Sequence, residues 1–409
     1  MKKIILLIAT ALCLLTVAGY FWHLSLKDNK PQENKPQESK PLFREVHFKH
    51  LPGWDKADLK QSLRAFQTSC RAFIKQGPEQ VVGTEGIALQ AKDWHPACKA
   101  ALALDIDQEQ NAKSFFQHWF APVEFYEKEP GPGLFTGYYM PTIKGSLQRT
   151  KEFNVPLYEV PNDLITVDLG LFNPDFKNRK VIGRLSGNKL VPYHTREEIT
   201  KGALKNKARV LLWIHSPIDR LFLEIQGSGV VELEDGSKWF VGYDGQNGAP
   251  YTAIAGVLIK QGVMTKDNAS MQGIKRYLEA HPDQINAVIN QNKSFIFFRK
   301  LNLDGALGSQ GVVLTPGYSL AVDRQWIPMG APLWLSTTRP DSKSPDKSKP
   351  MQRLMIAQDT GGAIKGKIRG DVFWGEGEKA TLIAGHMKNA GHYWLLLPRH
   401  TMSRIAKNT

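Results

Sequence analysis

The chain of 409 residues carries 53 Lys and Arg against 39 Asp and Glu, which gives a formal net charge of +14. This length favours two or three domains, and a hydrophobic content of 42% excludes a wholly disordered chain. Three cysteines without a CxxC pair argue against a disulfide-stapled scaffold and a structural zinc site. The positive balance fits nucleic acid, an anionic membrane or an acidic polymer, and does not choose among them.

The first 26 residues predict export. Lys2 and Lys3 precede an uncharged apolar run at 4–22, which as a helix would cover ~28 Å, about the hydrocarbon thickness of a bilayer. The leading lysines predict a cytoplasmic N-terminus and an exported body. We favour a membrane anchor, and the small residues at 17–19 leave a cleaved signal sequence as the alternative. Export removes nucleic acid from the expected partners.

A polar linker is predicted at 27–44. Between 29 and 41 the chain repeats KPQE and holds no apolar residue to bury, so we expect a disordered tether between membrane and body. Cys13 lies inside the apolar run and follows Thr10, Ala11 and Leu12, which match a lipoprotein signal poorly. That mismatch disfavours lipidation.

Three helices are predicted at the start of the body. The first has apolar residues at four- and three-residue spacing, which marks one face of a helix: Leu59, Leu63, Phe66, Cys70 and Phe73. The second is capped by Asp93, has Pro96 in its first turn and carries Cys98, and the third contains 115–119. In an exported protein Cys70 and Cys98 could form a disulfide, with two buried thiols as the alternative.

From residue 134 short strands and turns replace the helices. Asp235 and Gly236 are typical of a tight hairpin turn between two of these strands. The predicted strands are 209–215, 221–226, 229–233, 239–243 and 294–299, and the predicted helices are 252–260 and 270–280. The polar segment 341–350 predicts a solvated loop, and 399–409 a loose tail. The pattern indicates an α+β body that is mainly β.

Common catalytic motifs are missing from the sequence, which has no HExxH, GxxxxGK[ST] or GxSxG. His47 and His50 have no carboxylate-rich cluster beside them, so we predict no metal site. Ser228 lies between Gly227 and Gly229 without an evident base, which indicates a tight turn or a loop that a substrate approaches.

The segment 357–375 is the strongest candidate for chemistry. Asp359 and Asp371 bracket eleven residues, four of them glycine, and glycine permits tight turns and the close approach of a ligand. Asp371 stands near Phe373 and Trp374, and apolar surroundings raise a carboxyl pKa toward the value that a general acid requires. On composition alone, two aspartates that accept turn hydrogen bonds are the better explanation.

Several ordered stretches resemble the membrane-bound lytic murein transglycosylase A (MltA) family and together span about 45–398. They are 133–141 (GLFTGYYMP), 155–161, 223–229 (LEIQGSG), 241–251 (VGYDGQNGAPY), 295–298, 311–332 and 354–377. The last two contain Asp323, Asp359 and Asp371, which match the three aspartates of the family's 3D signature.

The resemblance implies a mainly β α+β fold with two domains. A double-psi β-barrel core domain would comprise 45–140 and 300–398, with the 3D motif at 311–377. A second, β-barrel-like domain would be inserted at 141–299, with a groove between the two. The partners implied are peptidoglycan glycan strands, the membrane through the N-terminal segment and other cell-wall enzymes. The N-terminal segment predicts a location at the periplasmic face of a bacterial envelope membrane, and we expect no cofactor.

The resemblance also implies roles for individual residues. Asp371 falls on the family's catalytic aspartate, Asp359 on its supporting partner, and Asp323 on an aspartate that we expect to be structural. The expected substrate-binding residues are Tyr138, Tyr139, Gln226, Gly227, Ser228, Asp244 and Trp374. One carboxyl would protonate the glycosidic oxygen between MurNAc and GlcNAc, and then accept the proton of the C6 hydroxyl that attacks C1.

Two other functions fit the same sequence. An inverting glycan hydrolase on the same barrel would use Asp359 to activate water. A non-catalytic, expansin-like module would bind the cell wall without cleaving it. The first would leave reducing ends on its products, and the second would release no product.

Overall fold

The computed structural model describes residues 43–105, 109–125, 132–176, 179–265, 268–302 and 305–405. The predicted anchor, and the predicted linker up to residue 42, lie outside these ranges. Leu42–Thr409 forms one compact unit. Within the ranges that the structure describes, no helix has both the length and the apolar character needed to cross a membrane.

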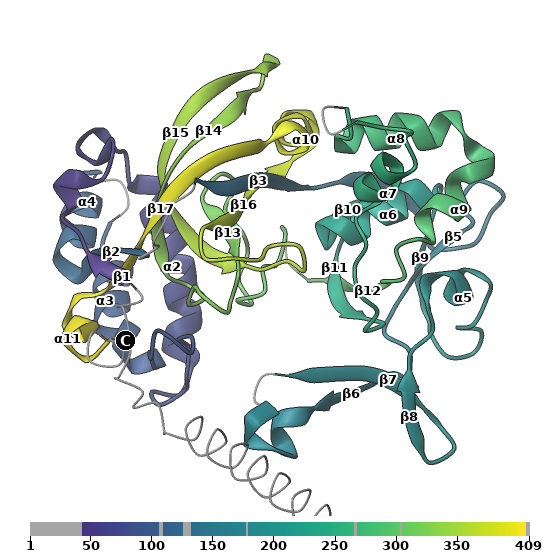
Figure 1. The fold of residues 1–409 in the computed structure, drawn as a ribbon, viewed down its shortest axis with the longest axis horizontal. Helices are drawn as coiled ribbons and strands as arrows, with labels where there is room; N and C mark the ends of the chain where they lie inside the picture. Colours follow the sequence, from purple (N-terminus) through teal and green to yellow (C-terminus); the bar gives the residue numbers. More distant parts are fainter. Residues whose placement is uncertain are drawn as a thin grey trace, which may run out of the picture. The chain divides into compact units, whose positions relative to one another are not determined.

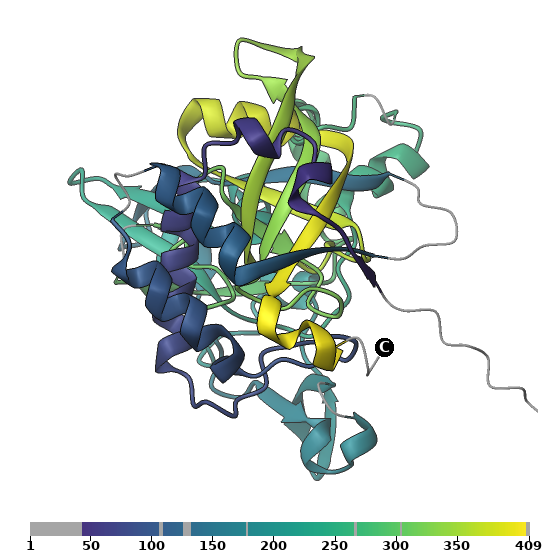
Figure 2. The same cartoon turned by 90° about the vertical axis from the view of Figure 1, so that its left-hand side faces the viewer.

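Three helices begin the body, and the apolar face of the first is buried as its spacing predicted. The second begins at Ala91, before the predicted cap, because Gln90 caps it and Asp93 completes a capping box. Phe73 stacks on Trp94 with ring centroids 4.9 Å apart, which packs the first helix against the second. Cys70 and Cys98 form a disulfide between the same two helices. Figure 2 shows these helices lying against the strands of the main sheet. The helices are α2 (Lys60–Lys75), α3 (Ala91–Ala103) and α4 (Glu109–Trp119).

The main sheet closes into a six-stranded barrel. Its strands are ordered β17-β14-β15-β13-β16-β3, and a pairing of β3 with β17 completes the ring. Apolar side chains of α2–α4 and of the barrel strands share one core cluster, which includes Phe66, Trp334 and Leu395. The barrel strands are β3 (Gly133–Met140), β13 (Ser319–Val322), β14 (Pro332–Asp341), β15 (Ser344–Asp359), β16 (Arg369–Glu376) and β17 (Lys388–Pro398), and β2 (Phe120–Phe125) and β1 (Phe43–Glu45) extend the sheet beyond β17.

A second sheet follows directly from the barrel, because β3 ends at Met140 and the next strand begins at Thr142. Figure 1 shows β3 running from the barrel toward this second sheet. Its strand order is β12-β11-β10-β4-β9-β5. The strands are β4 (Thr142–Ser146), β5 (Val155–Tyr158), β9 (Val210–Ile214), β10 (Ser228–Leu233), β11 (Lys238–Gln246) and β12 (Ile296–Leu301).

Short helices accompany the second sheet, and two more accompany the barrel. Gln272 on α8 donates a hydrogen bond of 3.1 Å to the carbonyl of Thr381 on α10, which ties the two groups of helices together. The helices are α5 (Arg196–Thr200), α6 (Pro217–Gln226), α7 (Ile254–Lys260), α8 (Met271–Ala280), α9 (Ile285–Ile289), α10 (Gly377–His386) and α11 (Met402–Ile405). A separate three-stranded sheet contains β6 (Ile165–Asp168), β7 (Lys180–Ser186) and β8 (Lys189–Pro192).

The prediction of a strand at 221–226 is wrong, because this segment belongs to α6. Ser216 accepts a hydrogen bond from the backbone N–H of Ile218, Pro217 occupies the first helical turn, and Gly227 ends the helix with a φ of 78°. A cap, an early proline and a left-handed glycine are all helix boundary signals. A short apolar run fits a strand or a buried helix equally well, so the signals at its ends decide.

Two further segments differ from the predictions. The polar segment 341–350 is part of a hairpin instead of a solvated loop, since β14 and β15 pair from Pro332–Ile356 out to Asp341–Ser344. Its side chains are polar because both strands extend beyond the core. Residues 399–405 form helical turns instead of a loose tail, and Ile405 at their end is buried.

Candidate active site

The barrel brings Asp359 and Asp371 to either side of one central residue. Ala321 on β13 is in register with Asp359 on β15 and, on its other side, with Asp371 on β16. Neighbouring strands lie about 4.8 Å apart, so the backbones of the two aspartates are roughly 10 Å apart. Residues in register project from the same face of a sheet, and the two carboxyls therefore flank a common surface.

Asp371 is held by a short chain of side chains. The hydroxyl of Thr136 on β3 donates a 2.6 Å hydrogen bond to Oδ1 of Asp371, and Nη2 of Arg369 donates to that hydroxyl at 2.8 Å. No hydrogen bond from a described residue reaches the other oxygen, Oδ2. Asp371 as a whole is neither fully buried nor fully exposed.

The environment tunes Asp371 toward acid chemistry near neutral pH. Burial of the carboxyl raises its pKa to about 6, and the negative charge of Asp359 acts in the same direction. The hydrogen bond from Thr136 and the guanidinium of Arg369 oppose this shift in pKa, since both stabilise the ionised form. A carboxyl with such a pKa can release a proton and take it back at nearly the same pH.

Asp359 differs from Asp371 because both of its oxygens already accept hydrogen bonds. The backbone N–H groups of Ser309 and Thr360 donate to Oδ1 at 3.0 and 2.9 Å, and the Tyr138 hydroxyl donates to Oδ2 at 2.8 Å. Burial raises the pKa of Asp359, and these three donors partly offset the rise. Three donors fix the orientation of this carboxyl, which suits a supporting group.

Tyr138 contacts Asp359 through its hydroxyl and an apolar cluster through its ring. Its ring packs on Phe373 with centroids 5.3 Å apart, and both side chains belong to a cluster that also includes Ala321. Burial and the nearby carboxylates raise the pKa of Tyr138 well above its usual value, so its hydroxyl stays protonated and donates to Asp359. The cluster supplies the apolar surroundings that raise the carboxyl pKa values.

Asp323, the first aspartate of the signature, makes contacts that fit the structural role expected of it. It follows β13 and is only 4% exposed. Its carboxylate accepts hydrogen bonds from the backbone N–H groups of Gln325 at 3.2 Å and Gly366 at 2.9 Å. The second contact ties the glycine-rich connection between β15 and β16, which places Asp359 and Asp371 at its two ends.

The expected substrate-binding residues occupy different places. Oε1 of Gln226 accepts a 2.9 Å hydrogen bond from the backbone N–H of Tyr139, so α6 meets β3 directly beyond Tyr138. Ser228 follows Gly227 and is buried in the pairing of β10 with β11. Asp244 lies in the bulge of β11, 3.6 Å from Nε of Arg299. Tyr138 alone among the expected substrate-binding residues has a hydrogen bond to either carboxyl within the described ranges.

Trp374 lies on the other face of β16 from Asp371 and Phe373. A Cβ atom placed on Gly137 would lie 2.7 Å from Nε1 of this indole, which shows how closely the ring covers the glycine. The ring is packed against the core cluster of the helices and barrel. This position does not favour the expected stacking on a sugar held by the two aspartates.

Sequence reasoning missed Thr136 and Arg369. Both lie in or beside stretches that carried the family resemblance, at 133–141 and two residues before Asp371. Their role follows from the parallel pairing of β3 with β16, which sets Thr136 beside Asp371. This pairing brings together residues 235 positions apart in the chain, so no local sequence pattern predicts the contact.

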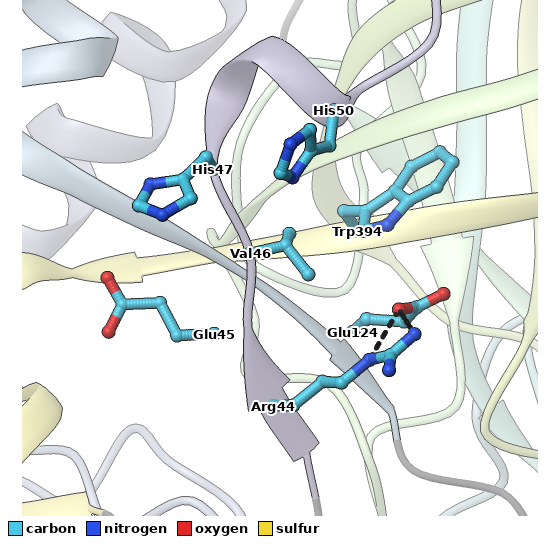
Figure 3. Close-up of a pocket in the computed structure, with 7 residues that line it drawn as sticks. All are labelled: Arg44, Glu45, Val46, His47, His50, Glu124 and Trp394. Atoms are coloured by element: carbon cyan, nitrogen blue, oxygen red, sulfur yellow. Dashed lines mark hydrogen bonds and ion pairs between the residues drawn. The ribbon is translucent and has the colours of Figure 1, made fainter.

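A pocket elsewhere contains none of the expected site residues. Figure 3 shows it beside β1, β2 and β17, with Arg44 and Glu124 joined by an ion pair of 2.8 Å. His47 and His50 line it with ring centroids 5.7 Å apart, but the described ranges hold no group of three residues suited to a metal. The pocket is lined by Arg44, Glu45, Val46, His47, His50, Glu124 and Trp394.

Comparisons with known proteins agree with this architecture. The MltA specific insert domain matches residues 134–299, and the 3D domain matches 318–397. The membrane-bound lytic murein transglycosylase A of Escherichia coli strain K12 is 34% identical over 264 residues, which are 64% of this chain and 65% of that protein. The match thus spans slightly less than two thirds of the curated relative.

Solved structures extend the match over most of the body. MltA from Neisseria gonorrhoeae is 34% identical with a TM-score of 0.73, and the match covers 87% of this chain and 92% of that one. Escherichia coli MltA with bound chitohexaose is 26% identical with a TM-score of 0.61, covering 83% of this chain and 89% of that one. Because the chain is 34% identical to MltA from Neisseria gonorrhoeae and the match covers 92% of that protein, the chain belongs to the membrane-bound lytic murein transglycosylase A family.

Proposed function

We propose that this protein is a peptidoglycan lytic transglycosylase. It cleaves the β-1,4 bond between MurNAc and GlcNAc without water and leaves a 1,6-anhydroMurNAc end. The observation that carries the proposal is Asp371, a carboxyl with a pKa of about 6 and one oxygen without a hydrogen bond from a described residue. The curated and solved relatives support the same class of enzyme.

In the proposed mechanism Asp371 acts first as an acid and then as a base. Its proton passes to the glycosidic oxygen as the bond to C1 of MurNAc breaks, which releases the GlcNAc hydroxyl. The C6 hydroxyl of the same MurNAc then attacks C1, and the Asp371 carboxylate accepts its proton. The carboxyl is restored, and no water is consumed.

Asp359 supports this cycle without exchanging protons. Its negative charge helps to keep the pKa of Asp371 high, and Tyr138, Ser309 and Thr360 hold it in place. A hydrolase would instead need Asp359 to activate water. Donors on both oxygens fix the orientation of Asp359, and a fixed carboxylate suits a support. The arrangement thus favours a supporting role over a second catalytic role.

The glycan strand would bind in a groove between a double-psi barrel domain and an inserted domain. We assign 45–140 and 300–398 to the first and 141–299 to the second, with Tyr139, Gln226 and Ser228 near their junction. Chitohexaose, the oligosaccharide bound to the relative from Escherichia coli, has the same β-1,4 linkage as the proposed substrate. The positive net charge suits a polymer that bears carboxylates.

The relatives' name supports attachment to a bacterial envelope membrane. We propose that 1–26 anchors the chain and that 27–44 tethers the body at the periplasmic face. Other cell-wall enzymes are the partners that such a location offers.

Mass spectrometry of products from purified sacculi tests the function. The full chain should release muropeptides that are lighter by one water than reducing-end products and resistant to borohydride reduction. Reducing ends would identify a hydrolase that uses Asp359 with Asp371. Binding to sacculi without any release would identify a wall-binding module, and either result would overturn the proposal.

A further inference from the structure

The sheet formed by β6, β7 and β8 projects from the rest of the body in both views (Figures 1 and 2). We call residues 165–176 and 179–192 the β6–β8 arm. Among the described residues of this arm, no hydrophobic side chain is buried. A three-stranded sheet usually depends on an apolar face packed against something, so the missing core calls for a partner.

The arm instead exposes much of the apolar surface of the protein. It carries six of the fourteen large hydrophobic side chains that are exposed in the described ranges. Leu171 and Phe172 are the most exposed of all, at 85% and 78%. Contiguous exposed apolar side chains mark interaction sites in soluble proteins. The six are Leu171, Phe172, Phe176, Val181, Leu185 and Leu190.

Strand register gathers part of this surface on one face of the sheet. Val181 and Leu185 are four residues apart on β7, so both project from the same face. Leu190 on β8 is directly opposite Leu185, and Val167 on β6 is directly opposite Val181. The remaining three side chains lie in and beside the 3-10 turns Leu169–Leu171 and Pro174–Phe176, which join β6 to β7.

Basic residues accompany the apolar ones. The described residues of the arm include four Lys and Arg against two Asp. Arg179, Lys180 and Lys189 are exposed, and the Arg179 guanidinium lies 5.6 Å from the centre of the Phe176 ring. Exposed Leu and Phe beside Lys and Arg is the composition of segments that bind the interface of an anionic bilayer.

We propose that the β6–β8 arm is a membrane-docking surface that inserts Leu171 and Phe172 into an anionic lipid leaflet while its basic residues contact the headgroups. A second copy of this chain is a poorer occupant, because a self-complementary contact would bring the same positive charges together. The contact is separate from the predicted anchor at 1–26 and does not depend on the proposed activity.

Vesicle binding by the body without the anchor tests the proposal. Leu42–Thr409 is one compact unit that contains all five apolar clusters of the described residues, so it has the core needed to fold alone. Its far-ultraviolet circular dichroism and thermal unfolding verify folding for every variant. The probe is sedimentation with phosphatidylcholine vesicles, prepared with and without about 30% of the anionic lipid phosphatidylglycerol.

We expect the body to bind the anionic vesicles, with partitioning reduced about tenfold or more by the pair Leu171→Ser and Phe172→Ser. The matched control Leu147→Ser, at a side chain 56% exposed outside the arm, should bind as the unchanged body does. The pair Lys180→Ser and Lys189→Ser should weaken binding to anionic vesicles and reduce its dependence on salt.

Two results would overturn the proposal. One is a folded body that fails to sediment with anionic vesicles, or whose binding the Leu171 and Phe172 changes leave intact. The other is a dimer of the body in solution that these changes dissociate, which would assign the surface to a second copy. Release of anhydro-muropeptides from soluble glycan fragments should be unchanged in all arm variants, so failure here leaves the proposed activity untouched.

Discussion

The two strands beside β13 each carry an aspartate, and the two carboxyls differ in their hydrogen-bond partners. On the β15 side, Asp359 accepts three hydrogen bonds that occupy both of its oxygens. On the β16 side, Asp371 accepts one from Thr136, and its second oxygen has none from a described residue. Burial raises the pKa of both carboxyls. In the mechanism that we propose, this difference in hydrogen-bond partners, more than any difference in burial, separates the acid and base from its support.

The largest expected effect follows from Asp371→Asn in the full chain. An amide cannot deliver a proton at neutral pH, so release of anhydro-muropeptides from sacculi should fall about 10²–10⁴-fold. Asp346→Asn, an exposed change of the same type on the β14–β15 hairpin, should retain full release. A folded Asp371→Asn protein with near-normal turnover would show that another group supplies the proton.

The same substitution should stabilise the protein above pH 6. The folded pKa of Asp371 is raised to about 6, so the folded state holds a proton that the unfolded chain releases at lower pH. Stability therefore falls as pH rises from about 4 to about 6, and the full penalty persists above that range. Because Asn carries no charge, the substitution removes this penalty and should raise the free energy of unfolding by about 1–3 kcal/mol at pH 8.

Thermal unfolding at two pH values measures this gain. The unfolding temperature of Asp371→Asn should exceed that of the unchanged protein at pH 8 and approach it near pH 4. Equal unfolding temperatures at pH 8 would mean that Asp371 ionises without cost, and its raised pKa could not be correct. A variant that loses activity and gains stability would show that the buried carboxyl is retained for the reaction at a cost in stability.

Part of this architecture was accessible to sequence reasoning, and the exceptions have physical causes. The burial of Leu63, Phe66 and Phe73 follows from helical spacing, which is local. The helix at 217–226 was missed because its short apolar run fits both periods, and its cap and terminal glycine carried the information. A short apolar segment can be assigned as helix or strand only when the residues at its ends are considered together with its periodicity.

The candidate site shows the same division between local and distant information. Asp359 and Asp371 stood out by resemblance, since composition alone favoured turn hydrogen bonds. Thr136 was not identified, because its contact with Asp371 depends on the register of two strands far apart in the chain. Pairings of this range are set by the closure of the barrel, which no segment encodes by itself.

An intermediate effect is expected from Asp359→Asn. The negative charge of Asp359 raises the pKa of Asp371, so removing it should lower that pKa and move the loss of activity to lower pH. At neutral pH less of Asp371 would be protonated, and an amide cannot accept all three hydrogen bonds that hold the Asp359 carboxylate in place, so release should fall about tenfold. The pH dependence of product release from sacculi measures the shift. Loss as complete as in Asp371→Asn would instead identify Asp359 as a catalytic base.

The smallest expected effect comes from Thr136→Val, and it should have the opposite sign. The Thr136 hydroxyl stabilises the ionised form of Asp371, so its removal should raise the pKa of that carboxyl. Activity should then persist to higher pH, with only a few-fold change at the optimum. Thr136→Ser keeps the hydroxyl and should retain the original pH profile. Because Asp359→Asn and Thr136→Val act on Asp371 from opposite sides, shifts in opposite directions would locate the titrating group between them. Shifts in the same direction would contradict Asp371 as that group.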